Sequence, residues 1–110
     1  MIATFNDYSV EARSTEFFPK DLSIAYLVIG LSGETGEICN KYKKVLRDAE
    51  GELTEQSLLE MRKEVGDVLW YLDRLAECLG SSLQAEAVNN IKKLKDRHAR
   101  GVVAGSGDNR

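Results

Sequence analysis

Two short acidic stretches carry residues whose types and spacing suit metal chemistry. Glu34 and Glu37 lie three positions apart in "GETGE", and Glu64 and Asp67 repeat that spacing in "EVGD". Residues three apart on a helix have Cβ atoms ~5–6 Å apart, so each pair can bind one cation from one side. Ligands that are all oxygen atoms suit Mg²⁺ or Mn²⁺ and leave positions for water and phosphate. We therefore predict that these four acids form a metal site.

Both pairs contain a glycine just before the second acid, and both interrupt apolar sequence. Gly36 and Gly66 each cost about 1 kcal/mol of helix propensity, and a missing side chain lets a backbone or a ligand approach closely. A single acid pair at this spacing usually lies on a solvated helix face, and Glu52 with Glu55 is another such pair. Two pairs that share the inner glycine favour a binding site over a solvated surface.

The elements that must position these acids are predicted to be helices. Proline occurs once, at Pro19, and alternating β-branched residues are nearly missing, which predicts an all-α fold. Thr54 is expected to cap the third helix and Gly80 to end it, and Ser81 or Ser82 to cap the fourth. The expected helices cover about residues 4–14, 22–47, 55–79 and 83–98, followed by a glycine-rich, non-helical tail over about 99–110.

The third expected helix has the pattern of a helix-bundle seam. Its apolar residues recur at alternating intervals of three and four: Leu58, Met61, Val65, Val68, Leu72, Leu75 and Leu79. Glu34 lies on the corresponding apolar stripe of the second helix, with Leu27, Leu31 and Ile38. Four such helices in 110 residues bury a marginal core. We predict one four-helix-bundle-like domain over residues 1–110 that self-associates.

Composition narrows the class of protein. The net charge of −3, with both signs spread along the chain, gives no bulk attraction to nucleic acid. Cys39 and Cys78 lie in apolar helical segments without zinc-site spacing, so we expect reduced, buried thiols. The N-terminus has no signal-peptide pattern, and no apolar run is expected to approach the ~20 residues of a membrane span. These observations predict a cytoplasmic protein without nucleic-acid or membrane partners.

Basic residues gather where the second and fourth helices are expected to end, in "KYKK" with Arg47 and in "NNIKKLKDRHARG". The helix dipole explains a single cluster of this kind. Two clusters together with a carboxylate site instead indicate a polyphosphate, bound by metal on one side and by Lys and Arg on the other. The missing Gly-rich P-loop excludes a Walker-type enzyme. The only histidine, His98, leaves no Glu-x-x-His pair for a di-iron site.

The stretches "GLSGETGEICNKYKK", "EVGDVLWYL", "NNIKKLKDRHARG" and "GSGDNR" together resemble the MazG-type all-α nucleoside triphosphate pyrophosphohydrolases, in particular compact single-domain members from bacteria and phages. The resemblance covers the chain from about Tyr8 to Arg110. It implies Mg²⁺-dependent cleavage between the α and β phosphates of an NTP or dNTP, giving a nucleoside monophosphate and pyrophosphate. It also implies a homodimer or homotetramer whose sites form where helices of two subunits meet.

Matched by position, the resemblance implies metal-binding and catalytic roles for Glu34, Glu37, Glu64 and Asp67. Glu37 is one candidate for accepting the proton of the attacking water. The implied substrate contacts are Asn90, Lys93 and Arg97, with Asn89 and Lys92 as the alternative register and Lys41 and Lys44 as looser phosphate contacts.

The tail adds a hypothesis: it folds over the pocket and places Arg110 near the phosphates or the base. Two other readings of the chain stay open beside the enzyme. One is a catalytically silent nucleotide-binding module of the same fold. The other is a helical dimerisation domain whose acids form a solvated face.

Overall fold

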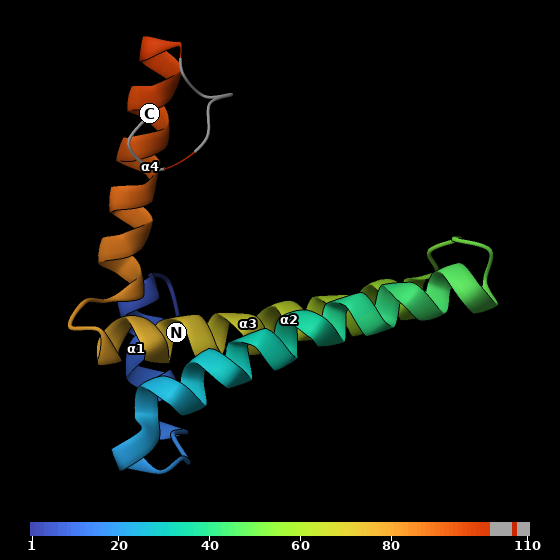
Figure 1. Ribbon diagram of the computed structural model, residues 1–110, viewed down its shortest axis with the longest axis horizontal. Helices are drawn as coiled ribbons and strands as arrows, with labels where there is room; N and C mark the ends of the chain where they lie inside the picture. The colour runs from blue at the N-terminus through green and yellow to red at the C-terminus, as the bar shows by residue number, and fades with distance from the viewer. Residues whose placement is uncertain (102–106, 108–110) are drawn as a thin grey trace.

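The computed structural model describes residues 1–101 and 107, and within them it contains helices and no strand, which confirms the all-α prediction (Figure 1). A short 3-10 turn, η1, precedes the second of four α-helices. The elements in chain order are α1 (Phe5–Ser14), η1 (Lys20–Leu22), α2 (Ser23–Asp48), α3 (Glu55–Cys78) and α4 (Leu83–Arg100).

Local sequence sets the ends of these helices. Thr54 caps α3 by accepting a hydrogen bond from the backbone N–H of Ser57, whose hydroxyl accepts one from the Thr54 N–H in return. Ser82 caps α4 by accepting from the Ala85 N–H at 3.0 Å, so Ser82 and not Ser81 is the cap. Gly80, at φ 80°, follows α3 in the left-handed conformation that glycine adopts without strain.

The long helices α2 and α3 form an antiparallel hairpin that makes up most of the molecule (Figure 1). The tight turn between them places Glu50 at φ 54° and Gly51 at φ 81°. Along this hairpin the middle of α2 faces the middle of α3. The two acidic stretches of the sequence are therefore brought to the same level.

A buried ionic cluster attaches α1 and the following loop to α3. Arg74, 1% exposed, donates from Nη1 to Glu16 at 2.6 Å and from Nη2 to Asp73 at 2.8 Å, and it also pairs with Glu77. Burial disfavours the charged form of Arg74, but the hydrogen bonds to Glu16, Asp73 and Glu77 outweigh it and raise the pKa. The remaining members of this Arg74 cluster are Ser9, which donates to Asp73, Arg13, which donates to Glu77, and Lys20, which donates to Glu16.

The fourth helix corrects the expectation of a bundle within one chain. Among the described residues α4 packs on α1 and α3 but makes no contact with α2, and Figure 1 shows it rising steeply away from the hairpin. Its apolar residues Val88, Ile91 and Leu94 stay 42%, 51% and 41% exposed. The apolar side of α4 therefore does not complete a four-helix bundle with α2 of the same chain.

The core of a single chain is consequently thin. Among the described residues the buried apolar ones are Ala12, Leu27 and Val45. The accessible surface is 7892 Å² and the radius of gyration is 17.0 Å, against about 6,100 Å² and about 13 Å for a compact chain of this mass and length. Most of the expected seam on α3 is half-buried, and Val65 is 59% exposed. The monomer therefore leaves much apolar helix surface without protein contacts.

Two expectations about apolar segments were wrong. Cys39 and Cys78 are free, as expected, but they are exposed rather than buried. The segment Lys20–Asp48 also reaches the length and composition of a membrane span, and 6% of its most apolar window is buried. Core helices of water-soluble proteins meet the same criterion, so the finding establishes an extensive apolar surface on α2.

Candidate metal centre

Three of the four predicted acids meet across the hairpin. Glu34 comes from the middle of α2, and Glu64 and Asp67 lie one turn apart on the facing side of α3. One carboxylate oxygen from each of the three lies within 4.8 Å of the others. Glu34 and Glu64 are half-buried and Asp67 is exposed, so this acid trio opens to solvent on one side.

The electrostatics of the acid trio favour a cation. Burial raises the pKa of Glu34, and the charge of Asp67, a hydrogen bond with Glu64 and the charges of Glu64 and Glu37 raise it further. A divalent cation among the three oxygens would reverse this repulsion. The donor set, three carboxylates with one open side, fits a hard cation such as Mg²⁺ or Mn²⁺ that keeps water or phosphate in its remaining positions.

Glu37 is not part of the acid trio. It lies one turn beyond Glu34 on α2, and its side chain is exposed. Three residues advance a helix by about 300°, so a neighbour at this spacing points about 60° to one side. Its charge still contributes to the raised pKa of Glu34, which places it beside the acid trio rather than within it.

Gly36 and Gly66 do not make the close approach that the sequence predicted. A Cβ at Gly36 or Gly66 would meet no atom of the chain within 4 Å, so the close approach expected there is not made inside one chain. The close approach occurs one turn before Glu34, where a Cβ on Gly30 would lie 2.1 Å from Cε1 of Tyr71. Gly30 therefore allows the Tyr71 ring to lie against α2 next to the acid trio.

The predicted substrate contacts on α4 are not brought to the acid trio within one chain. Asn89, Asn90 and Lys93 line a shallow hollow of about 290 Å³ together with Glu86. Arg97 is buried and donates to the carbonyl of Gly107 at 3.4 Å. The helix α4 makes no contact with α2, which carries Glu34, and none of these four residues belongs to the acid trio.

The two further phosphate candidates, Lys41 and Lys44, lie on the same hairpin as the acid trio. Lys41 and Lys44 line a hollow of about 420 Å³ between the ends of α2 and α3, to which Gln56 and Glu60 also contribute. Glu60 is one helical turn before Glu64, so this hollow continues from the acid trio toward the turn. Arg110 lies outside the described residues.

Sequence reasoning missed an aromatic cluster that adjoins the acid trio. Phe18 stacks on Tyr26 with ring centroids 5.3 Å apart, and it meets the edge of Trp70 at 6.4 Å. Tyr26 and Trp70 both adjoin Tyr71, at 6.5 and 5.1 Å. The signal was available in the spacing of Tyr26 and Gly30, one turn apart on α2, which leaves room for an aromatic residue from the facing helix.

Comparison with known proteins identifies the family. The model of the MazG nucleotide pyrophosphohydrolase domain matches residues 23–102. The chain therefore belongs to the MazG nucleotide pyrophosphohydrolase domain family, and the resemblance noted in the sequence is confirmed. The chain is also similar to the Gene 37 protein of Mycobacterium phage L5, with 40% identity over 109 residues that cover 94% of this chain and 96% of that protein. No solved structure gives a significant match.

Proposed function

We propose that the protein is a Mg²⁺-dependent nucleoside triphosphate pyrophosphohydrolase that cleaves the α–β phosphate bond of an NTP or dNTP. The observation that carries the proposal is the acid trio, which lies within the segment matched by the family model. Three carboxylates converging on one point have no opposite charge among themselves to compensate them. That arrangement is costly unless it serves to bind a cation.

In the proposed mechanism Glu34, Glu64 and Asp67 would hold the metal ion with one carboxylate oxygen each. Mg²⁺, when bound, neutralises charge on phosphate oxygens and lowers the pKa of a bound water. Glu37 is exposed beside the trio, and we assign it to accept the proton that the water loses. Water is added across the anhydride, the phosphorus–oxygen bond to pyrophosphate breaks, and the proton resides on the Glu37 carboxylate.

The phosphates need cations as well as metal, and two groups of residues are available for them. Lys41 and Lys44 line the hollow that continues from the acid trio on the same hairpin. Asn90, Lys93 and Arg97 lie on α4, whose apolar side is about half exposed at Ile91. We propose that a homodimer or homotetramer covers this apolar surface and supplies the α4 residues of one subunit to the acid trio of another.

The test is to incubate the protein with each NTP and dNTP plus Mg²⁺ and to measure pyrophosphate and orthophosphate separately. Pyrophosphate and a nucleoside monophosphate are expected. Orthophosphate would indicate a different bond, and no turnover by folded, Mg²⁺-loaded protein would favour a silent nucleotide-binding module. Sedimentation at micromolar concentration tests the shared site, because a fully active monomer would contradict it.

A further inference from the structure

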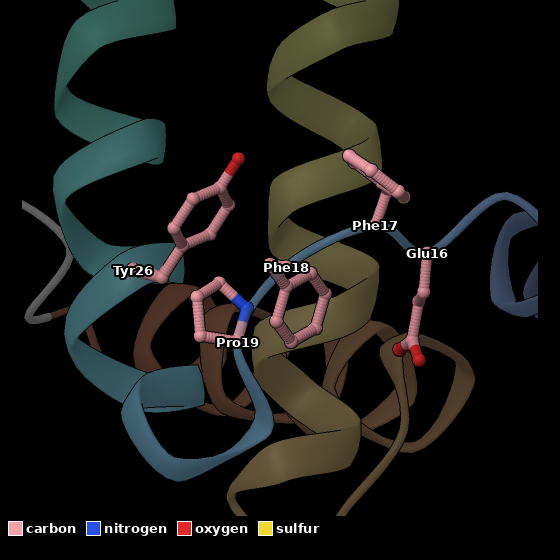
Figure 2. A pocket seen from close by; sticks show the side chains of 5 residues that line it. All are labelled: Glu16, Phe17, Phe18, Pro19 and Tyr26. Atoms are coloured by element: carbon pink, nitrogen blue, oxygen red, sulfur yellow. The ribbon is translucent and has the colours of Figure 1, made fainter.

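One hollow on the surface of this chain is lined mainly by aromatic rings. It has a volume of about 560 Å³ and is lined by residues of the loop before η1 and by one residue of α2: Glu16, Phe17, Phe18, Pro19 and Tyr26. Figure 2 shows Tyr26 projecting from α2 and facing Phe18 and Pro19 of the loop, with α3 behind them. Phe17 is 93% exposed. We name this feature the aromatic hollow.

Two tyrosines lie between the aromatic hollow and the acid trio. Tyr26, which lines the hollow, has its ring centroid 6.5 Å from that of Tyr71, and the charges of Glu34 and Asp67 act on the Tyr71 hydroxyl. Burial raises the pKa of Tyr71 first, and the neighbouring Tyr26 and the two carboxylates raise it further. A ligand with an anionic end at the acids and a flat end in the hollow would therefore lie along this tyrosine pair.

The walls of the hollow are held in place from behind. Arg74 of the buried cluster fixes Glu16 at 2.6 Å, at one side of the loop. The indole N–H of Trp70 donates to the hydroxyl of Thr15 at 2.7 Å, next to the same position. The loop that presents Phe17 and Phe18 is thereby attached to α3 at two points, and the hollow does not depend on a ligand to form.

We infer that the aromatic hollow binds the base of the nucleotide whose phosphates lie at the acid trio, and that it prefers purines to pyrimidines. The inference rests on the proposed function. Aromatic faces bind bases by stacking, which tolerates any base and strengthens with ring area. The carboxylate of the lining is already engaged, because Glu16 accepts hydrogen bonds from Arg74 and Lys20. Ring area rather than hydrogen bonding then decides the preference.

Binding without turnover tests the inference directly. The full chain with Mg²⁺ would be titrated with adenosine monophosphate, cytidine monophosphate and ribose 5-phosphate, by calorimetry and by the fluorescence of Trp70. Trp70 is the only tryptophan, and its ring meets Phe18 edge-on at 6.4 Å. Adenosine monophosphate should bind most tightly, cytidine monophosphate less tightly and ribose 5-phosphate least. Only the two nucleotides should change the fluorescence of Trp70. Equal affinity for all three ligands would overturn the inference.

A substitution in the hollow isolates the contribution of stacking. Phe17→Ala removes an exposed ring without touching the core, and it should weaken adenosine monophosphate by roughly 5- to 100-fold, the range for removing a ring that stacks on a base. Ribose 5-phosphate should bind unchanged. Leu22→Ala is the matched control, because Leu22 is apolar and 60% exposed but outside the hollow. Unchanged nucleotide binding in Phe17→Ala, or equal weakening of both ligands, would overturn the inference.

Two further measurements separate this inference from its alternatives. If Phe17→Ala converts an oligomer to a monomer and leaves nucleotide affinity intact, a second copy of the chain occupies the hollow and the inference fails. If the protein releases pyrophosphate equally well from purine and pyrimidine triphosphates and Phe17→Ala leaves every KM unchanged, the proposed function stands without this base site. Purine-selective binding without any hydrolysis would support the base site and contradict the proposed function.

Discussion

The acid trio and the Arg74 cluster both include residues of α3, and their charges are arranged in opposite ways. The trio of Glu34, Glu64 and Asp67 gathers three like charges with one open side. The Arg74 cluster mixes both signs, and its two central residues, Asp73 and Arg74, are each 1% exposed. The chain itself compensates the charges of the Arg74 cluster, but it does not compensate those of the acid trio.

The two regions show two different uses of charged side chains in one small protein. Where acids and guanidinium groups satisfy one another, burial is tolerated and the charges attach α1 to α3. Where the acids face only one another, the charged form is disfavoured and the pKa of Glu34 rises. The first arrangement stabilises the fold, and the second reserves a position for a cation that the chain does not supply.

The largest effect is expected at the buried centre of the Arg74 cluster. Arg74→Met leaves Asp73 and Glu16 without their shared partner in a buried site, so the free energy of unfolding should fall by about 3–5 kcal/mol. Urea denaturation measures it. Arg13→Met is the control: the Arg13 side chain is 54% exposed, so its loss should lower the free energy of unfolding far less than the loss of Arg74. Equal losses in the two variants would mean that burial does not distinguish the pairs.

In the acid trio, substitution should separate activity from stability. Glu34→Gln should lower kcat/KM by about a hundredfold, because several kcal/mol of charge stabilisation depend on the metal site. Without metal, the same change removes a repelling charge, so the melting temperature should stay the same or rise. Glu52→Gln, at an acid outside the trio, is the matched control for both measurements. A strongly destabilised, fully active Glu34→Gln protein would make these acids structural partners.

Acidification should affect the two regions in opposite directions. The raised pKa of Glu34 means that the folded state holds a proton more tightly, so this group stabilises the fold as the pH falls. Hydrogen bonding to Arg13 lowers the pKa of Glu77 despite burial, so that contribution is present above the ordinary value and lost as the pH falls through the lowered one.

Glu34→Gln isolates the pH effect of the acid trio. In metal-free protein the variant should match the wild type in unfolding free energy at low pH, where Glu34 is protonated in both states. It should become the more stable one as the pH rises through the raised pKa of Glu34. Denaturation of both proteins from about pH 4 to about pH 7 gives the difference directly. A pH-independent difference would show that charge repulsion is not its source.

The smallest effect is expected at the exposed edge of the Arg74 cluster. Lys20 pairs with Glu16, but its side chain is 69% exposed. Lys20→Met should therefore change the free energy of unfolding by about 0.5 kcal/mol or less, since exposed ion pairs contribute little. Added salt should erase the change. A loss close to that of Arg74→Met would show that the cluster acts as one unit rather than through its buried centre.

Features that depend on neighbouring residues were predictable from the sequence. The helix-capping residue Thr54 and the terminating Gly80 act within a few positions of themselves, and both were placed correctly. The meeting of Glu34 with Glu64 and Asp67 followed from one further assumption, that consecutive long helices joined by a tight turn lie antiparallel. Glu37 lies outside the acid trio. A spacing of three residues predicts that two side chains share one side of a helix, but not that both reach the same point.

Features that depend on distant residues were not predictable. Arg74 meets Glu16 across 58 positions of the chain, and nothing in the local pattern around either residue indicates the other. The direction of α4 also has no local signature, because an amphipathic stripe indicates that a helix packs and not against which partner. The same reason explains Cys39 and Cys78, which lie in apolar segments but on their exposed sides.

The α2–α3 hairpin has a consequence for the order in which the protein folds. Its two helices are consecutive and joined by a tight turn, so their pairing can begin beside the turn, where closing the short loop costs little entropy. The hairpin, and with it the acid trio, can assemble early and within a single molecule. The helix α4 makes no contact with α2 of its own chain, and its apolar residues stay about half exposed. In the proposed oligomer, burial of that apolar side would be a later, bimolecular step whose rate should rise with protein concentration.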